Sequence, residues 1–286
     1  MQITTCRTPE SFLARTQAML EQHEAVNNLM LGLAETIIRT PDRYLAWYLF
    51  TVDDEAEIYI AALWTVPLNI IIHVANPNPQ AITLLARHLH DNYHKKAVAV
   101  PGVTGRVESV VAFADAWTAL VGGTWQVKLH MRVYELRQVI PPVGIEGRLV
   151  QATSDHQAMI AEWIHAFHRE ALHSSMTLEE AAQIANRHIA QRDLYLWLVG
   201  DEPVSMAAQN RQTRHGAVIG LVYTPPEQRG HGYASAVVAG ASQIALESGK
   251  AFCTLFTDLN NPTSNSIYQK IGYYPLEDFD EIHFAP

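Results

Sequence analysis

The order of strand-like and helix-like segments repeats along the chain, and this repetition limits the possible folds more than any other feature. In the second half, "RLVQA" has the pattern of a strand, and two segments with helical spacing follow it. The second of these begins with Thr177 and Glu180 in the positions of a capping box. Three β-like runs separated by "GDE" and "RHG" predict an antiparallel meander. A helix near 231–248, a strand "AFCTLFT", a helix opened by "NNPTSNSIYQKIG" and a last strand or two complete the half.

The first half can be divided in the same order. It has a strand at "QITTC", two helices, three strands, a helix, a strand at "KAVAV", a helix and a strand at "WQVKLHMRVYEL". Between the halves, residues 138–148 combine a Pro pair with two glycines, as inter-domain connections often do. We therefore predict an internal duplication with two α/β (α+β) domains, residues 1–140 and 146–286. Each is expected to be a mixed, mostly antiparallel sheet flanked by helices.

The charge balance argues against nucleic acid as the principal partner. The 286 residues include 20 Lys and Arg against 29 Asp and Glu, which gives a formal net charge of −9, and the longest basic run is Lys95-Lys96. Phosphate backbones require a concentrated basic face, which this sequence does not predict.

Compartment and membrane association follow from two further features. Cys6 and Cys253 are far apart and lack the spacing of a zinc site or a disulfide framework, so a reducing cytosol fits best. The amino terminus has no basic region followed by an apolar core, so no signal peptide is predicted. The longest apolar stretch is interrupted by Pro67 and Asn69, which favours two strands over a membrane span. We expect a cytoplasmic protein without a membrane partner.

The segment "YTPPEQRGHGYASAVV", residues 223–238, places two glycines just before a helical pattern. A helix amino terminus has N–H groups without intrahelical partners and attracts anions, most often phosphates. Gly230 and Gly232 permit positive φ and close approach of a ligand to the main chain, and Arg229 could add a charge-assisted contact. The corresponding stretch of the first half, "HVANPNPQAITLL", contains no glycine. The second half is therefore expected to carry any anion site.

The two glycines are also compatible with a tight turn that binds nothing, or with a different nucleotide site. A P-loop is excluded because no G-x-x-x-x-G-K-[ST] occurs in the chain. A dinucleotide fingerprint is a rival because Asp258 ends the following strand, but Ser235 stands where the third glycine belongs.

Two motifs resemble those of the GNAT acyl-CoA-dependent N-acyltransferases. "RGHGYA" matches the family's [QR]-x-x-G-x-[GA] loop, and "NNPTSNSIYQKIGY" is similar to its last helix. The resemblance covers about residues 146–284, whereas the first half resembles the fold only by its order of elements. It implies a tandem GNAT-like protein whose first domain is degenerate and lacks the coenzyme loop. It also implies acetyl-CoA as a co-substrate, with no metal.

The resemblance assigns roles to individual residues. The loop amides are implied to hold the coenzyme A pyrophosphate, the end of the preceding strand to lie beside the pantetheine, and two asparagines of the last helix to assist. These cofactor-binding candidates are Leu221, Val222, Tyr223, Arg229, Gly230, His231, Gly232, Tyr233, Ala234, Asn261 and Asn265. Asn261 followed by Pro262 is also a good helix cap in its own right. Tyr268 is the implied general acid, since a tyrosine with an ordinary pKa of about 10 can donate a proton to a departing thiolate.

The general base is not indicated by any motif. Some members of the family use a glutamate on the third meander strand, but "GAVIGLVY" has no carboxylate. Glu170 is the candidate because its region borders the acceptor site in the family, and His168 and His173 are rivals. With His165, these histidines are too spread around a helix to converge on a metal ion, and no H-E-x-x-H is present.

The sequence thus predicts an acetyl-CoA-dependent N-acetyltransferase in which a primary amine of a small molecule or peptide attacks the thioester directly. A coenzyme A-binding regulatory module in which catalysis has lapsed is the alternative. A tandem relative that takes aminoacyl groups from tRNA is disfavoured by the net charge of −9. The identity of the acceptor and the oligomeric state are left open.

Overall fold

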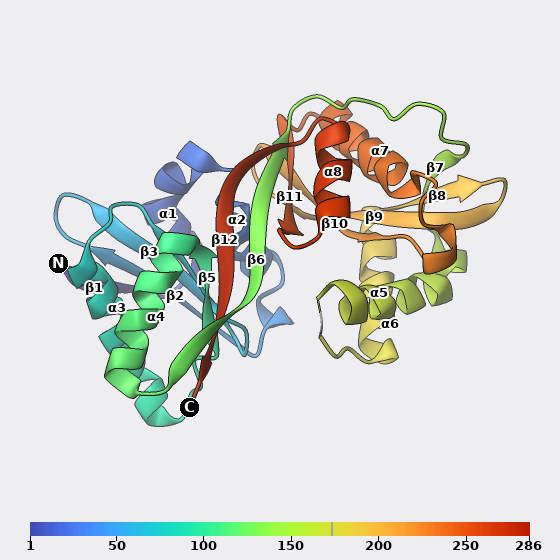
Figure 1. Cartoon of the computed structure of the whole chain (residues 1–286). Coiled ribbons are helices and arrows are strands. Elements are labelled where there is room, and N and C mark those ends of the chain that lie inside the picture. Colours follow the sequence, from blue (N-terminus) through green and yellow to red (C-terminus); the bar gives the residue numbers. More distant parts are fainter. Residues whose placement is uncertain (173) are drawn as a thin grey trace. The chain divides into compact units, whose positions relative to one another are not determined.

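The computed structural model describes residues 1–172 and 174–286, which form two compact units (Figure 1). Unit 1 comprises Met1–Val133, Thr257–Asn260 and Leu276–Pro286, and unit 2 comprises Tyr134–Phe256 and Asn261–Pro275. Each unit has mostly antiparallel strands with helices on both faces, so the predicted fold class is confirmed. Among the described residues, no helix combines the length and apolar character needed to cross a membrane.

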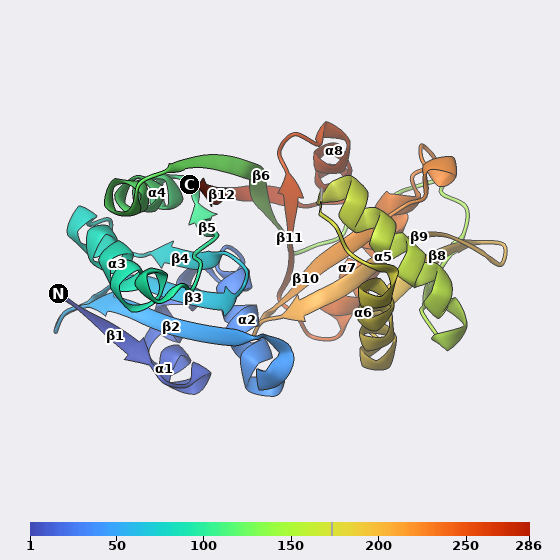
Figure 2. The ribbon, with the colours of Figure 1, turned by 90° about the horizontal axis from the view of Figure 1, so that it is seen from below.

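Unit 1 has the predicted order of elements. They are β1 (Gln2–Cys6), α1 (Pro9–Leu20), α2 (Asn28–Arg39), β2 (Ala46–Asp53), β3 (Ile58–Val66), β4 (Ile70–Val74), α3 (Pro79–Asn92), β5 (Gly102–Arg106), α4 (Val107–Val121) and β6 (Thr124–Leu136). Side chains alternate between the two faces of the sheet, as they do in any strand. Phe50 and Val52 pack with α3 and α4, whereas Leu49 packs with α1 and α2. Figure 2 shows α3 and α1 on opposite sides of the strands.

The prediction of a strand at residues 96–100 was wrong, because β5 begins at Gly102. Ala97 adopts a left-handed conformation (φ +62°), which interrupts an extended chain before the predicted strand can form. Val98 and Val100 still pack against the core. The alternation of apolar residues in this segment therefore indicated which side chains are buried, but not that the segment forms a strand. Gly102 suits the strand because a Cβ there would lie 2.0 Å from the carbonyl oxygen of Ile282.

The last strand of the chain, β12 (Tyr274–Ala285), pairs with unit 1. It runs antiparallel to β5, with Phe279 opposite Arg106, and puts Ile282 in the core of that unit. The end of β6, by contrast, puts Tyr134 and Leu136 in the core of unit 2. The last strand of the chain therefore belongs mostly to unit 1, whereas β6 stays in unit 1 up to Val133 and only its end belongs to unit 2. The sequence-based ranges 1–140 and 146–286 do not include this placement of β12, because the side-chain pattern of a strand does not specify its partner.

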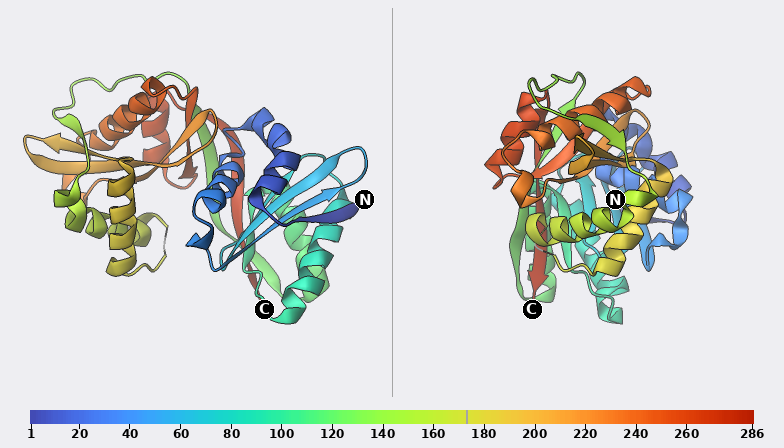
Figure 3. Two further views of the ribbon diagram at one scale, coloured as in Figure 1. Left: turned by 180° about the vertical axis from the view of Figure 1, so that it is seen from behind. Right: turned by 90° about the vertical axis from the view of Figure 1, so that its right-hand side faces the viewer.

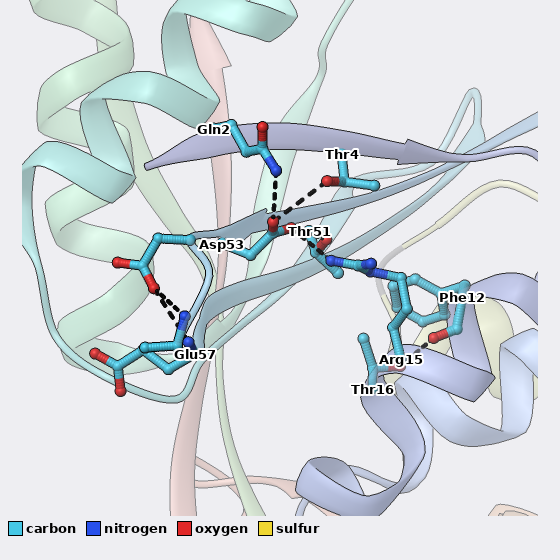
Figure 4. Close-up of polar contacts among 10 residues, drawn as sticks. Gln2, Thr4, Phe12, Arg15, Thr16, Thr51, Asp53 and Glu57 are labelled. Atoms are coloured by element: carbon cyan, nitrogen blue, oxygen red, sulfur yellow. Dashed lines mark hydrogen bonds and ion pairs between the residues drawn. The ribbon is translucent and has the colours of Figure 1, made fainter.

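The edge strand β1 is held to β2 by a buried carboxylate (Figure 4). Asp53 accepts hydrogen bonds from Gln2 Nε2 and Thr4 Oγ1, both at 3.3 Å, and from Thr51 Oγ1. Arg15 of α1 forms an ion pair with it at 3.0 Å. These donors hold the pKa of Asp53 below its usual range despite its burial.

Unit 2 repeats the same order. Its elements are β7 (Arg148–Gln151), α5 (Gln157–Ala171), α6 (Leu178–Gln191), β8 (Leu194–Val199), β9 (Glu202–Gln212), β10 (Gly216–Tyr223), α7 (Tyr233–Glu247), β11 (Phe252–Asp258) and α8 (Pro262–Lys270). The predicted capping box of α6 is confirmed, since Glu180 N donates to Thr177 Oγ1 and Thr177 N donates to the Glu180 carboxylate. Helices α5 and α6 pack together on one face of the meander, and α7 packs on the other (Figure 3).

Candidate functional site

The meander strand β10 is irregular where the candidate site begins. Its parallel pairing with β11 runs from Gly216 to Val218, and its register against β9 shifts after Val218 and again between Gly220 and Tyr223. The second shift leaves two residues of β10, Leu221 and Val222, opposite a single residue of β9, and Leu221 has φ +49°. A bulge of this kind takes backbone groups out of the regular ladder, so they become available to a ligand.

The glycine loop that follows β10 ends in the amino terminus of α7. Gly230 has φ +85° and Gly232 has φ +84°, a conformation that favours glycine at both positions. Gly232 is the N-cap of α7, and within the described residues no side chain caps this helix. The first N–H groups of α7 therefore lack partners from a capping side chain. A Cβ at Gly230 would have no described atom within 4 Å, so this side of the loop is open.

Helix α7 is fixed firmly behind the loop. Its Val237, Val238 and Ala241 are buried in the core of unit 2. Gln209 of β9 donates from Nε2 to the carbonyl oxygen of Ala241 at 3.1 Å. The anion-attracting end of the helix is thus presented on a rigid element.

In unit 1 the corresponding helix, α3, has a capped amino terminus. The side chain of Asn78 accepts hydrogen bonds from the backbone N–H groups of Gln80 (2.9 Å) and Ala81 (3.4 Å) at the start of α3. Pro79, the first residue of that helix, has no N–H group. The amides that would receive an anion are therefore occupied or missing in unit 1.

Arg229, predicted to belong to the coenzyme loop, forms an ion pair with Glu170, the candidate general base. Arg229 Nη2 lies 2.6 Å from Glu170 Oε2, and Arg229 Nε donates to the Thr224 carbonyl oxygen at 2.9 Å. The guanidinium lies over the Tyr223 ring, 5.8 Å from its centroid, and the Tyr223 hydroxyl donates to Glu170 Oε1 at 3.3 Å. The hydrogen bond from Arg229 holds the pKa of Glu170 below its usual range. Within this ion pair the Glu170 carboxylate is a weaker base than a carboxylate without a cationic partner.

Helix α8 carries the second group of predicted residues. The Asn261 side chain accepts from Ser264 N at 3.0 Å, so it caps the helix, and Asn265 Nδ2 donates to the Asn261 carbonyl oxygen at 2.8 Å. Tyr268 is buried, with its ring 6.0 Å from that of Tyr273. Burial raises the pKa of Tyr268 to about 12. Its hydroxyl therefore keeps its proton at neutral pH.

His168 lies on a different side of α5 from Glu170. His168 Nδ1 lies 3.1 Å from Ser174 Oγ, and burial lowers the pKa of His168 below its ordinary value. Two residues apart on a helix, His168 and Glu170 are separated by about 200° around its axis. His168 is thus neutral but points away from the side that contacts Arg229. His173 lies outside the described residues, and no group of metal-ligating side chains occurs among those that are described.

Neither cysteine is suited to act as a nucleophile. Cys6 and Cys253 are buried, and burial raises the pKa of both thiols, that of Cys253 to about 12. Because the thiolate is the reactive form, both side chains are inert at neutral pH.

Sequence reasoning missed two residues next to the site. Thr224 supplies the carbonyl oxygen that holds Arg229, and its Oγ1 lies 2.8 Å from Ser205 Oγ. Asn210 lies beside the bulge, where its Nδ2 would be 2.1 Å from a Cβ on Gly220. Asn210 lies at the first register shift, between the pairs Val218–Arg211 and Ile219–Gln209, and strand register is not readable from one sequence.

The fold and the loop together define an α/β domain that offers an uncapped helix terminus and a bulged strand to an anionic ligand. Comparison of the sequence with models of known protein families identifies this class of domain. Residues 157–273 match the model of the acetyltransferase (GNAT) family. The chain therefore carries a GNAT acetyltransferase domain, as the loop and last-helix motifs predicted.

Solved structures resemble the whole chain in fold. An acetyltransferase of the GNAT family from Colwellia psychrerythraea covers 100% of both chains with a TM-score of 0.61 and 11% identity. A GCN5-related N-acetyltransferase from Sphaerobacter thermophilus covers 98% of this chain and 94% of its own, with a TM-score of 0.62 and 15% identity. A tandem GNAT protein from the clavulanic acid biosynthesis pathway covers 99% and 98%, with a TM-score of 0.59 and 13% identity. No curated protein matches the chain in sequence. These likenesses establish a tandem GNAT-like fold.

Proposed function

We propose that the protein is an acetyl-CoA-dependent N-acetyltransferase whose active site lies in unit 2. The observation that carries the proposal is the loop before α7, where Gly230 and Gly232 both have positive φ and Gly232 replaces a capping side chain. A pyrophosphate in this loop would accept hydrogen bonds from the free amides and meet the positive end of the helix dipole. Membership of the domain in the GNAT family supports acyl-CoA as the donor of this pyrophosphate.

The geometry of the strand and of α8 supports the other proposed coenzyme contacts. The bulge at Leu221 and Val222 supplies backbone groups for the pantetheine amides, while the side chains of Leu221 and Tyr223 stay in the core. Asn265, one turn into α8, is the asparagine proposed to contact the coenzyme. Asn261 already serves as a helix cap, so its proposed role is to position Asn265.

The proposed chemistry is direct attack of a neutral primary amine on the thioester carbonyl. A C–N bond forms, the C–S bond breaks, Tyr268 donates its proton to the departing thiolate, and the surplus proton of the amine nitrogen passes to the general base. The raised pKa of Tyr268 supports this role because the hydroxyl remains protonated until the thiolate needs it. The buried, protonated state of both cysteines supports direct transfer over an acyl-enzyme intermediate.

We propose Glu170 as the general base because its carboxylate lies next to the coenzyme loop. It is the acidic side chain that contacts the loop, but its ion pair with Arg229 must open before it can accept a proton. His168 has the more suitable protonation state but faces away from Arg229. The absence of a carboxylate in β10 favours the alternative function, a coenzyme A-binding regulatory module in which catalysis has lapsed.

The partners and compartment are proposed on composition. The acceptor is a primary amine of a small molecule or peptide, and neither nucleic acid nor membrane is proposed as a partner, given the net charge of −9. Two free cysteines without a disulfide support a cytoplasmic location.

Isothermal titration of the purified protein with acetyl-CoA, and with NAD as a control, tests the proposal. We expect saturable binding of one acetyl-CoA per chain, because α3 of unit 1 is capped by Asn78. Release of free thiol is then measured with a series of primary amines. Binding without turnover by any amine would favour the regulatory alternative, and binding of NAD alone would refute the acyltransferase.

A further inference from the structure

We propose that the ion pair between Glu170 and Arg229 is a latch that the pyrophosphate of acyl-CoA opens, and that the released Glu170 carboxylate then binds a cationic amine acceptor. The inference rests on the proposed function and adds to it an order of binding and a class of acceptor. The latch is defined as Glu170, Arg229 and the Tyr223 hydroxyl.

The latch connects two elements with different tasks. Arg229 immediately precedes Gly230 in the loop proposed to hold the pyrophosphate, whereas Glu170 lies near the carboxyl end of α5. The distance of 2.6 Å between Arg229 Nη2 and Glu170 Oε2 is short for a charge-assisted hydrogen bond. As long as this contact lasts, the guanidinium charge is shared with Glu170 and the carboxylate is not free for an ammonium group.

The latch is weak enough for a ligand to open. The Arg229 side chain is 50% exposed and that of Glu170 is 31% exposed. Ion pairs this exposed contribute about 0 to 1 kcal/mol. A pyrophosphate offers several anionic oxygens, and arginine binds phosphate with two parallel hydrogen bonds. A pyrophosphate at Gly230 therefore competes successfully for the guanidinium.

Glu170 stays in position after Arg229 leaves. Its Oε1 accepts the Tyr223 hydroxyl at 3.3 Å, and Tyr223 is itself buried with its ring 6.1 Å from that of Trp163. Among the described residues, the other cation that contacts Glu170 is Arg169, 3.4 Å away and 67% exposed, which contributes little. The released carboxylate is thus a fixed negative charge that binds a protonated amine and, as the proposed base, takes its proton before the neutral amine attacks. The acceptor class that follows is an alkylammonium compound, which binds after the coenzyme.

The first test is the affinity for acetyl-CoA of a Glu170→Gln variant. Opening the latch costs binding energy only in the wild type, so the variant should bind acetyl-CoA about two- to fivefold more tightly. Glu162→Gln is the matched control, since Glu162 is an exposed glutamate on the same helix without a contact to Arg229. It should leave the affinity unchanged.

A double-mutant cycle separates the latch from a general effect of charge. In an Arg229→Ala background, Glu170→Gln should no longer change the affinity for acetyl-CoA, because there is no guanidinium to release. A Glu170→Gln variant that binds acetyl-CoA as the wild type does, or more weakly, would overturn the latch. A wild type that fails to bind acetyl-CoA would overturn the proposed function as well, so the two failures are distinguishable.

The acceptor class is tested with butylammonium chloride, titrated into the protein with and without saturating coenzyme A. Coenzyme A should strengthen butylammonium binding several-fold in the wild type and not in Glu170→Gln. Equal binding with and without coenzyme A in the wild type would overturn the part of the proposal that concerns the acceptor.

Discussion

Substitution of Gly230 by alanine tests whether the loop before α7 holds an anion. Gly230 has φ +85°, and a Cβ built there meets no described atom within 4 Å. The only cost to folding is therefore the left-handed backbone of a residue with a side chain, about 1 to 2 kcal/mol. The new methyl group points into the open side of the loop, where a pyrophosphate must approach the backbone amides.

The expected loss of coenzyme affinity is larger than this strain explains. A hydrogen bond to a charged group contributes about 1.5 to 3 kcal/mol, so displacing the pyrophosphate from one amide should weaken acetyl-CoA binding roughly 10- to 100-fold. Isothermal titration measures the affinity, and urea denaturation measures the free energy of unfolding of the same samples.

Gly249→Ala provides the matched control. Gly249 also has positive φ (+100°) and open space around its Cβ, but it follows the carboxyl end of α7. The 15 residues of that helix separate it from the loop by about 22 Å. Both variants should lose similar stability, and only Gly230→Ala should lose coenzyme affinity. Equal affinities for acetyl-CoA in the two variants would refute the assignment of the loop as a pyrophosphate site.

Three other variants test the site and the fold. Tyr268→Phe should lower kcat about 100-fold or more while the Kd for acetyl-CoA stays nearly constant, because a general acid acts only in the transition state; an unchanged kcat would remove Tyr268 from the mechanism. Asp53→Asn should lower the free energy of unfolding by about 2 kcal/mol in urea melts at pH 7, since it removes a buried charged acceptor. Because the folded pKa of Asp53 is lowered, its contribution is present above pH 4 and lost as the pH falls through the folded pKa, so wild type and variant should converge in acid. Burial lowers the pKa of His73 to about 4, so the unfolded chain binds the extra proton between pH 6.5 and 4, and stability should fall by about 3 kcal/mol over that interval. His73→Gln should remove that component of the pH dependence, and an unaltered pH profile would contradict it.

Sequence patterns predicted the elements that local interactions define. The capping box at Thr177 and Glu180, the three meander strands and the position of α7 all depend on residues within a few positions of each other. The glycine loop is local as well, because positive φ is a property of single residues, and both Gly230 and Gly232 have it.

Features that depend on distant pairs were not predictable. Nothing in "KAVAV" indicates that β5 begins at Gly102, where the approach of Ile282 from the chain's last strand requires a residue without a Cβ. The pairing of β12 with β5 of unit 1 is invisible in the sequence for the same reason. The contact of Glu170 with Arg229 joins residues 59 apart in sequence, so the sequence suggested both residues but not that they hold each other.

The two units show how one position in a fold can either provide or remove an anion site. In both units a strand of the meander leads through a short loop into a helix, α3 or α7. Asn78 and Pro79 satisfy or eliminate the amides of α3, which favours the helix itself. Gly232 supplies no capping side chain to α7, which leaves its amides for a ligand at a cost in helix stability. Only the second arrangement leaves binding capacity at the helix terminus, and this difference supports the proposed pyrophosphate site in unit 2, where a ligand would supply the missing hydrogen bonds.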